Sequence, residues 1–397
     1  MSEEREPVIA GIETEKGNPE MMPDQSAVVS SETVKMPETG EISETAKMPE
    51  NTEIPERKLA SVQQVEAVTP IEGADLIECI HVLGWMVVGK KGELQAGDLC
   101  VYFEIDSFLP VCEQFEFLRK SCYRSNPFMG EGFRLKTQRF RGQISQGLIL
   151  PLTILPPGRD YTIGEDVTEL LGIRKWETEE RSTDLGNTIG SLPFGIPKTG
   201  EVRIQSCPKL LGEFAKVPSY YISTKMDGTS ATMYWKDGKF GVCGRNYEFA
   251  EDDASVFWRY AKAHDLAAKL GECGIPDVAI QGEFCGPGIQ KNRLRLKRPE
   301  WYVFTVIDLN TYQRYSLKAM LDLCERLGLQ HVPIEEQGEV FPYKTIDELL
   351  ERAKGKYPSG SNKEGIVIRS TEPVPCWLFH NAPLSMKVLN NDYLLKE

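Results

Sequence analysis

The chain has 397 residues, of which 41% are hydrophobic, and it is long enough to build two ordinary domains. No apolar run approaches the roughly 20 residues that span a bilayer, and the acidic N-terminus is unlike a secretory signal, so we expect a soluble intracellular protein without membrane contact. The ten cysteines include no Cys-x-x-Cys pair and the four histidines lie far apart, which argues against structural zinc and against a disulfide framework.

The net charge of −13 is concentrated in residues 1–56, which contain 14 acidic and 4 basic residues and no Phe, Trp or Tyr. The other 341 residues carry a net charge of only −3 and have room for local basic patches. Within the first segment, "SETVKMPETGEI" (31–42) is followed by "SETAKMPENTEI" (43–54), which matches it at 9 of 12 positions. Such a polar repeat buries too little apolar surface to offset its ordering entropy, so residues 1–56 are predicted to be a disordered acidic tail.

Residues 57–175 contain short β-rich runs separated by Gly, Pro and Asp turns, which predicts a small barrel or sandwich. These runs are "LIECIHVLGWMVVGK", "GDLCVYFEID", "FRLKTQRFRGQ" and "GLILPL". The phrase "IEGADLIECIHVLGWMVVGKKGELQAGDLCVYFEI" resembles OB-like barrels of the tRNA-binding type. We therefore expect an OB-like, nucleic-acid-binding domain.

One basic stretch in this domain, "FRLKTQRFRGQISQG", interleaves aromatic and basic residues. Its basic residues are Arg134, Lys136, Arg139 and Arg141. On a barrel face they would neutralise phosphates while Phe133 and Phe140 stack or pack. The alternative is an edge strand whose charges deter aggregation, but the OB-like context favours nucleic-acid binding.

Residues 176–200 are charged and then rich in Gly and Pro, which predicts a linker or a long loop. Residues 201–397 then alternate strand-like and helix-like patterns. The runs "SYYIST", "TMYWKDGKFGVCG", "DVAIQGEF", "WYVFTVIDL" and "EGIVIRS" predict strands. The runs "DDASVFWRYAKAHDLAAKLGE" and "LKAMLDLCERLGL" predict amphipathic helices. The expected fold class is α+β with antiparallel sheets.

A series of short motifs follows in this second domain. Lys225 lies in "STKMDGTS", a string that alone predicts only a turn with a solvated lysine. Further along the chain come "CGRN", "IQGEFCG", "WYVFTVIDL", "EGIVIRS" and "LSMKVLN". In this order over about 160 residues, the set resembles the nucleotidyl transferase motifs of the covalent ligase and capping-enzyme superfamily.

The domain order narrows this resemblance. DNA ligases and capping enzymes carry an OB domain after the last motif, whereas here the OB-like domain comes first and ten residues follow Lys387. Residues 57–397 are therefore similar to the Deinococcus-type RNA ligases. The resemblance implies an ATP-dependent RNA ligase that uses Mg²⁺ or Mn²⁺ to seal 3′-hydroxyl/5′-phosphate nicks in RNA or an RNA-containing duplex. We expect a monomer. The alternatives are a GTP-dependent capping-type guanylyltransferase and a non-catalytic RNA-binding protein with a vestigial transferase fold.

The resemblance also implies three catalytic roles. Lys225 would attack the α-phosphate of ATP and hold AMP as a phosphoramidate, for which its amine must be unprotonated. Glu364 would help to place the divalent metal, which prefers oxygen ligands. Lys387 would reach the α-phosphate and offset the charge that develops in the transition state.

Four further residues are expected to bind the nucleotide. Arg245 would contact the ribose or the incoming 5′-phosphate, and Glu283 would accept hydrogen bonds from the ribose hydroxyls. Phe304 would stack on the adenine, with Val367 against its opposite face. For each residue taken singly the alternative is core packing or a surface ion pair, and it is the ordered set that favours the site.

The chain departs from the motifs of related ligases at two places. Related RNA ligases often have a second lysine where this chain has Ser385, and DNA ligases often place a glutamate among the two residues before the lysine, here Ser223 and Thr224.

A second basic cluster follows Glu283 and is expected to contact the phosphates of the nicked duplex, although a solvated loop is the alternative. It comprises Lys291, Arg293, Arg295, Lys297 and Arg298.

Overall fold

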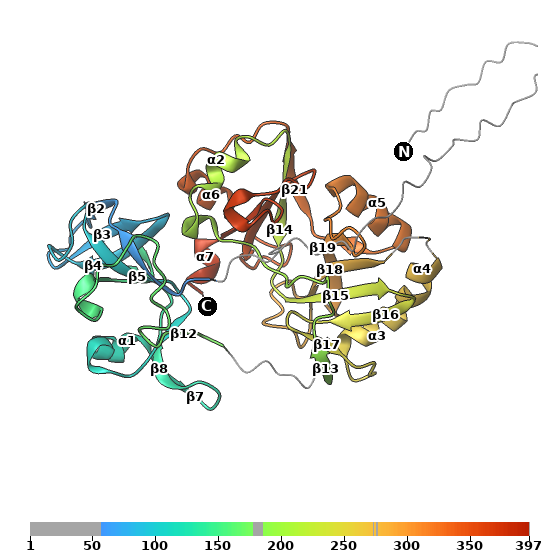
Figure 1. Ribbon diagram of the computed structural model, residues 1–397, viewed down its shortest axis with the longest axis horizontal. Helices are drawn as coiled ribbons and strands as arrows, with labels where there is room; N and C mark the ends of the chain where they lie inside the picture. Colours follow the sequence, from blue (N-terminus) through green and yellow to red (C-terminus); the bar gives the residue numbers. More distant parts are fainter. Residues whose placement is uncertain (1–56, 178–185, 273, 275–276, 397) are drawn as a thin grey trace, which may run out of the picture. The chain divides into compact units, whose positions relative to one another are not determined.

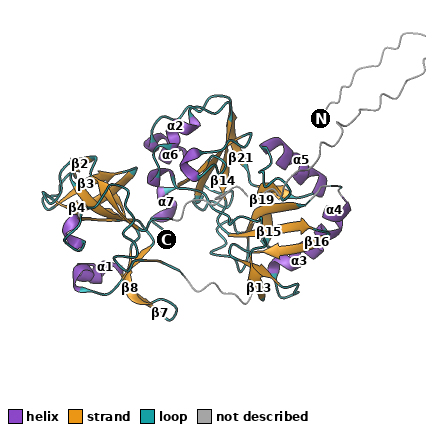
Figure 2. Cartoon of the chain, in the orientation of Figure 1, coloured by secondary structure: helices purple, strands orange, loops and turns teal. Residues whose placement is uncertain are grey.

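A computed structural model describes residues 57–177, 186–272, 274 and 277–396 of the chain. The predicted acidic tail with its repeat lies outside the described residues, as does the middle of the predicted linker. A β-rich N-terminal region (57–177) is followed by a C-terminal region of mixed sheets and helices (186–396), as Figures 1 and 2 show. No helix of the described residues has the length and apolar content needed to cross a membrane.

The N-terminal region contains short strands, the short helix α1 (Arg119–Cys122) and two separate apolar cores. Its strands are β1 (Ala60–Gln64), β2 (Ala67–Pro70), β3 (Ile77–Val82), β4 (Trp85–Lys90), β5 (Leu99–Phe103), β6 (Ser107–Leu109), β7 (Tyr123–Asn126), β8 (Gly130–Arg134), β9 (Thr137–Phe140), β10 (Gln143–Gln146), β11 (Leu148–Pro151) and β12 (Arg174–Lys175). They form four sheets with the orders β1-β5-β11, β2-β3-β4, β10-β9 and β12-β6-β8-β7. Consecutive side chains of a strand point to opposite faces. On β5, Val101 and Phe103 therefore join one core, and Cys100 and Tyr102 join the other.

The run "FRLKTQRFRGQ", one of the predicted β-rich runs, is divided in the structure. Its first residues end β8, and β9 then turns back into β10 as a hairpin. The turn residues Arg141 and Gly142 have φ angles of 45° and 88°. Paired positive φ angles match the right-handed twist of the flanking strands, so this turn ends the strand and exposes its basic tip.

The C-terminal region contains two antiparallel sheets and the helices that pack on them (Figure 1). The seven-stranded sheet has the order β13-β17-β16-β15-β18-β19-β20 and consists of β13 (Thr188–Ser191), β15 (Thr229–Lys236), β16 (Lys239–Cys243), β17 (Tyr247–Phe249), β18 (Val278–Cys285), β19 (Glu300–Asp308) and β20 (Gln330–His331). The four-stranded sheet has the order β21-β14-β22-β23 and consists of β14 (Tyr220–Lys225), β21 (Ile334–Gly338), β22 (Gly365–Ser370) and β23 (Ser385–Leu389). Only β20 runs parallel to its neighbour among these named pairs. The predicted α+β class with antiparallel sheets is confirmed.

The two runs that the sequence predicts to be helical are helical in the structure, and further helices lie outside those runs. Those of this region are α2 (Leu210–Phe214), α3 (Val256–Ala263), α4 (Leu266–Glu272), α5 (Leu317–Leu327), α6 (Ile346–Arg352) and α7 (Asn391–Leu394). Ser316 accepts the N–H of Ala319 at the start of α5, and Gly328 ends this helix with a φ of 67°. The run 252–272, expected as helical throughout, is interrupted at Asp265, whose φ of 51° separates α3 from α4.

The centre of the seven-stranded sheet depends on a close approach at Gly282, a buried residue of β18. A Cβ atom at this position would lie 2.5 Å from Nε1 of Trp301 and 2.8 Å from the carbonyl oxygen of Tyr302, both on the neighbouring strand. Trp301 is completely buried and stacks with Phe284. The strand therefore has no room for a side chain at this point.

We predict that Gly282→Ala lowers the free energy of unfolding by about 1–3 kcal/mol, because the added methyl group overpacks the core. The matched control is Gly212→Ala in α2, where the Cβ would meet no atom within 4 Å. This control is expected to be neutral or to stabilise by up to about 1 kcal/mol through helix propensity. Chemical denaturation of both variants measures the difference, and equal effects would contradict the packing argument.

Candidate active site

The motif "KMDG" connects the two sheets of the C-terminal region. Lys225 is the last residue of β14, and β15 of the other sheet begins at Thr229. A Cβ atom at Gly228 would collide with the carbonyl oxygen of Phe284 on β18, so only glycine fits this crossing without a shift of the strand. The sequence motif thus marks the place where the two sheets meet.

The register of the four-stranded sheet brings three of the predicted site residues onto one face. Lys225 lies opposite Gly365, and Ser223 lies opposite Val367. Val367 in turn lies opposite Lys387 on β23. Directly opposed residues of antiparallel strands project from the same face of a sheet. Lys225, Val367 and Lys387 therefore share one face.

Lys225 forms an ion pair with Glu364, the residue that precedes β22. Its Nζ atom lies 2.7 Å from a carboxylate oxygen of Glu364, and the two side chains are 23% and 16% exposed. Burial by itself would lower the pKa of Lys225, but the nearby charges of Glu364 and Glu283 raise it above its ordinary value. In the ligand-free protein this lysine therefore carries its proton.

Two more carboxyl groups surround the ion pair. Burial, with repulsion from Glu364 and Asp227, raises the pKa of Glu283 to about 8, although Lys225 and Arg245 oppose the shift. Burial and Glu364 likewise raise the pKa of Asp227. Three carboxyl groups in one part-buried site favour the arrival of a cation or the uptake of a proton.

The pKa of Lys387, the second lysine of the site, is lowered, whereas that of Lys225 is raised. Burial, reinforced by the positive charge of Lys225, lowers the pKa of Lys387 to about 7. Its backbone N–H donates to the carbonyl oxygen of Val202 at 2.8 Å, which fixes β23 at this position. Lys387 is therefore poised to take up a proton when an anion enters.

Phe304 and Arg245 lie near this charged centre on the seven-stranded sheet. Phe304 lines a cavity together with Glu201, Gln281 and Arg369. The guanidinium of Arg369 lies 5.6 Å from the centre of the Phe304 ring and donates to the carbonyl oxygen of the same residue. Arg245 follows β16 and is exposed, with its charge close enough to Glu283 to affect that carboxyl group.

The four basic residues of the stretch "FRLKTQRFRGQISQG" differ in exposure. Arg134 is an ion-pair partner of Asp106 at 3.0 Å and lies over the ring of Trp176, so its charge is already engaged within the protein. Lys136 is half-buried. Arg139 and Arg141 are exposed at the tip of the β9–β10 hairpin, where the Phe140 ring is also exposed.

The second basic cluster divides in the same way. Arg293 is an ion-pair partner of Asp227 at 3.0 Å, lies 4.3 Å from the ring centre of Tyr393 and has a side chain only 13% exposed. It therefore differs from the expected phosphate ligand, because its charge is already engaged inside the protein. The exposed members of the cluster are Lys291, Arg295, Lys297 and Arg298, the last of which is paired with Glu300.

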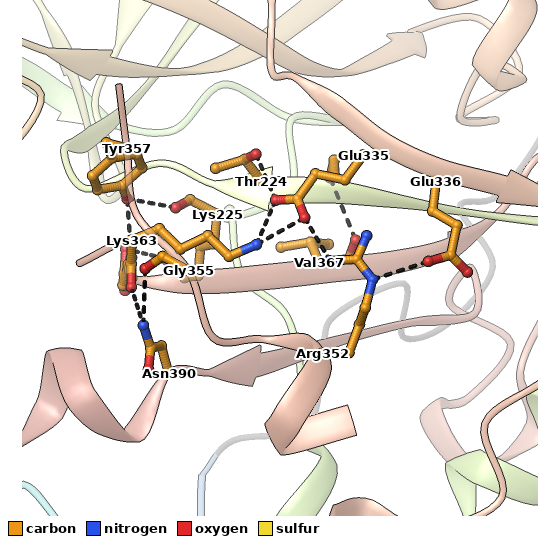
Figure 3. A network of polar contacts seen from close by, with 12 residues as sticks. Thr224, Lys225, Glu335, Glu336, Arg352, Gly355, Tyr357, Lys363, Val367 and Asn390 are labelled. Carbon is orange, nitrogen blue, oxygen red and sulfur yellow. Dashed lines mark hydrogen bonds and ion pairs between the residues drawn. The ribbon is translucent and has the colours of Figure 1, made fainter. Parts of the chain in front are cut away.

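The sequence motifs did not reveal the polar network behind this site, which Figure 3 shows. It includes Tyr357, whose hydroxyl donates to the carbonyl oxygen of Lys225 at 2.7 Å. It also includes Glu335, whose carboxylate accepts hydrogen bonds from Thr224 and Lys363, the residues that precede Lys225 and Glu364. The adjacency of Thr224 and Lys363 to motif residues is the single signal in the sequence that pointed to this network.

The residues present suit a metal ion that is shared with a bound phosphate. In the part of the chain that the structure describes, no group of three or more His, Cys, Asp or Glu side chains could hold a metal by itself. Mg²⁺, however, is usually bound through one or two carboxylates together with substrate phosphates and water. The carboxylate of Glu364, next to Asp227 and Glu283, fits this arrangement.

Comparison with known proteins gives a consistent result. A family model for an OB-fold domain matches residues 59–152, and a family model for RNA ligase matches residues 218–388. No curated protein matches the chain. Solved structures of a Naegleria gruberi RNA ligase do match, and each covers 86% of this chain: a point mutant without ligand (35% identity, TM-score 0.78, 98% of that chain), the enzyme with pyrophosphate (35%, 0.78, 99%) and a mutant with ATP and manganese (34%, 0.78, 99%).

These matches confirm the resemblance that the motifs indicated, including the position of the OB-fold domain ahead of the transferase motifs. They do not favour the capping enzyme or the non-catalytic RNA-binding protein. The chain therefore belongs to the RNA ligase family, with an OB-fold domain preceding the ligase domain.

Proposed function

We propose that this ATP-dependent RNA ligase seals 3′-hydroxyl/5′-phosphate nicks through an AMP carried covalently on Lys225. The observation that carries the proposal is the lysine of "KMDG" at the junction of the two sheets, 2.7 Å from Glu364 and on the same sheet face as Lys387. The structure of a Naegleria enzyme mutant with ATP and manganese supports ATP and a divalent cation as the cofactors of this chain.

In the first step, the Nζ atom of Lys225 attacks the α-phosphorus of ATP. A P–N bond forms while the bond from phosphorus to the bridging oxygen breaks, and pyrophosphate leaves. The amine must lose its proton first, and the carboxylate of Glu364 lies within hydrogen-bond distance to receive it. Glu364 would also hold the divalent cation, which supplies neutralisation of phosphate charge when bound.

The other residues bind and orient the nucleotide. Lys387 pairs with the α-phosphate and offsets charge as the pentavalent phosphorus forms. Arg245 contacts the ribose or the incoming 5′-phosphate, and Glu283 hydrogen-bonds the ribose hydroxyls. Phe304 stacks on the adenine, with Val367 of the facing sheet on its other side.

The later steps require a held RNA. AMP passes from Lys225 to the 5′-phosphate of the nick, and the 3′-hydroxyl then attacks this phosphate and releases AMP. The exposed cations of the two basic clusters supply phosphate contacts for this substrate. We assign them to Arg139, Arg141, Lys291 and Arg295. Monomeric state and intracellular location stay predictions.

We predict that Lys225→Met abolishes the covalent nucleotide adduct, because no other amine replaces the nucleophile. The measurement is incubation with labelled ATP and magnesium, followed by a denaturing gel, with labelled GTP in parallel. The matched control is Lys216→Met, which removes an exposed lysine paired with Glu213. An acid-labile adduct on the Lys225→Met protein would assign the chemistry to another residue.

We predict that ATP binding weakens as the pH rises through about 7, the pKa of Lys387. Below this pH the lysine is charged in the free protein, whereas above it Lys387 must take up a proton from the solvent when ATP binds, which costs affinity. Titration calorimetry between about pH 6 and about pH 8.5 on the wild-type protein, with an ATP analogue whose α–β bridge cannot be cleaved, measures the effect, because the charge of Lys225 contributes to the low pKa of Lys387. Lys387→Arg should flatten the profile, because its guanidinium stays charged, and an unchanged profile in that variant would reject the assignment.

We predict that reversing charge at Arg139 and Arg141 to Glu weakens binding of nicked RNA and reduces the dependence of log Kd on log salt by about 2. Formation of the lysyl-AMP should stay within about twofold of the wild type, because this step needs no RNA. Charge reversal at Lys90 and Lys91, which are exposed in the same region, gives the same net charge and serves as the control. Equal weakening by both pairs would indicate a general charge effect.

A further inference from the structure

A β-bulge in β21 brings two adjacent glutamates to the same arginine. Ile222 on β14 pairs with Glu336, but the next residue, Ser223, pairs with Ile334, so Glu335 is the extra residue of the bulge. Adjacent side chains of a regular strand point to opposite faces, and a bulge re-aims one of them. Here Arg352 of α6 donates to Glu335 at 2.7 Å and to Glu336 at 2.9 Å.

The re-aimed carboxylate of Glu335 is tied to both residues that precede the Lys225–Glu364 pair (Figure 3). Thr224 donates to Oε1 of Glu335 at 2.7 Å, and Nζ of Lys363 lies 2.7 Å from each carboxylate oxygen. Lys363 is only 5% exposed. Burial would raise the pKa of Glu335, but hydrogen bonds from Lys363, Arg352 and Thr224 lower it overall, so the carboxylate is ionised and accepts from every partner.

A single hydroxyl also connects the backbones of the two paired residues. The ladder between β14 and β22 ends at the pair Lys225 and Gly365. Just beyond it, the Tyr357 hydroxyl donates to the carbonyl oxygen of Lys225 at 2.7 Å and accepts the N–H of Glu364 at 3.1 Å. Tyr357 is buried, and the side chain of Asn390 donates to the carbonyl oxygen of Lys363 at 3.0 Å. The hydroxyl thus continues the strand pairing where backbone bonds stop.

We propose that Tyr357 and Glu335 are positioning residues that fix the backbones of Lys225 and Glu364 for adenylyl transfer. A lysine amine is attached through a flexible stem of four carbons. The direction from which its Nζ atom attacks therefore depends on where its backbone is anchored. A misplacement of about 1 Å at a reacting group costs on the order of 10²-fold in rate. The two residues contact neither ATP nor the transferred phosphate in this proposal, which rests on the proposed role of Lys225.

The test uses full-length Tyr357→Phe and Thr224→Val proteins, which each remove one hydroxyl and keep the side-chain shape nearly unchanged. We expect Tyr357→Phe to lower the rate of lysyl-AMP formation at saturating ATP by about tenfold or more, with the KM for ATP within about twofold. Thr224→Val should lower this rate by a smaller factor in the same way. Joining of a nick whose 5′-phosphate is already adenylylated should fall less, because Lys225 is not the nucleophile in that step.

The matched control is Tyr343→Phe. The Tyr343 hydroxyl donates to Glu336 at 2.8 Å in the same network, away from the Lys225 and Glu364 backbones. This variant should keep its adenylylation rate within about twofold, and thermal unfolding of all three proteins identifies any loss of fold. If Tyr357→Phe is unfolded at the assay temperature, Thr224→Val decides the question.

Three results would overturn the proposal: equal losses in Tyr357→Phe and Tyr343→Phe, equal losses in adenylylation and in joining of the preadenylylated nick, or a wild-type rate in the decisive variant. A wild-type protein that forms no adduct, or a Lys225→Met protein that keeps it, would instead reject the proposed function. The two failures are therefore distinguishable.

Discussion

The ion pair between Lys225 and Glu364 is the interaction on which the rest of this site depends. It joins the end of one strand to the residue that precedes its neighbour, at the point where the backbone ladder ends. Removing one partner of a part-buried pair leaves the other charge without compensation, which costs free energy. The same pair raises the pKa of Lys225, so this lysine carries its proton in the ligand-free protein.

In the ligand-free protein, burial and the neighbouring charges shift the pKa values of the lysines and carboxyl groups of the site. Lys387 is held close to losing its proton by burial and by Lys225, whereas burial and its neighbours raise the pKa of Glu283 to about 8, so this carboxyl group is mostly protonated at neutral pH. A triphosphate and its divalent cation would bring both signs of charge and move both groups toward their ionised forms. The electrostatic design therefore favours a ligand that carries phosphate and metal together, as ATP does.

Ring packing and hydrogen bonds restrict the movement of the two sheets that carry the site residues. On the seven-stranded sheet, Phe284 stacks with Trp301 and packs against Phe257 and Tyr260, so the strand that carries Glu283 cannot shift easily. On the four-stranded sheet, the bulge at Glu335 and the hydroxyl of Tyr357 tie the strand ends together. A transferase needs such prior order, because electrostatic stabilisation is effective only when its groups are already in place.

The sequence by itself determined the family and the α+β class and indicated Lys225 as the candidate nucleophile, because a Lys-x-Asp-Gly string, five further motifs in order and hydrophobic periodicity are all local patterns. It also located the basic clusters, but only the tertiary structure separated exposed Arg139 from Arg134 and Arg293, which are paired inside the protein. Both kinds of arginine look alike in a sequence, since burial and pairing depend on residues far along the chain. For the same reason the bulge at Glu335 and the hydroxyl of Tyr357, 132 residues from Lys225, became visible only in the fold.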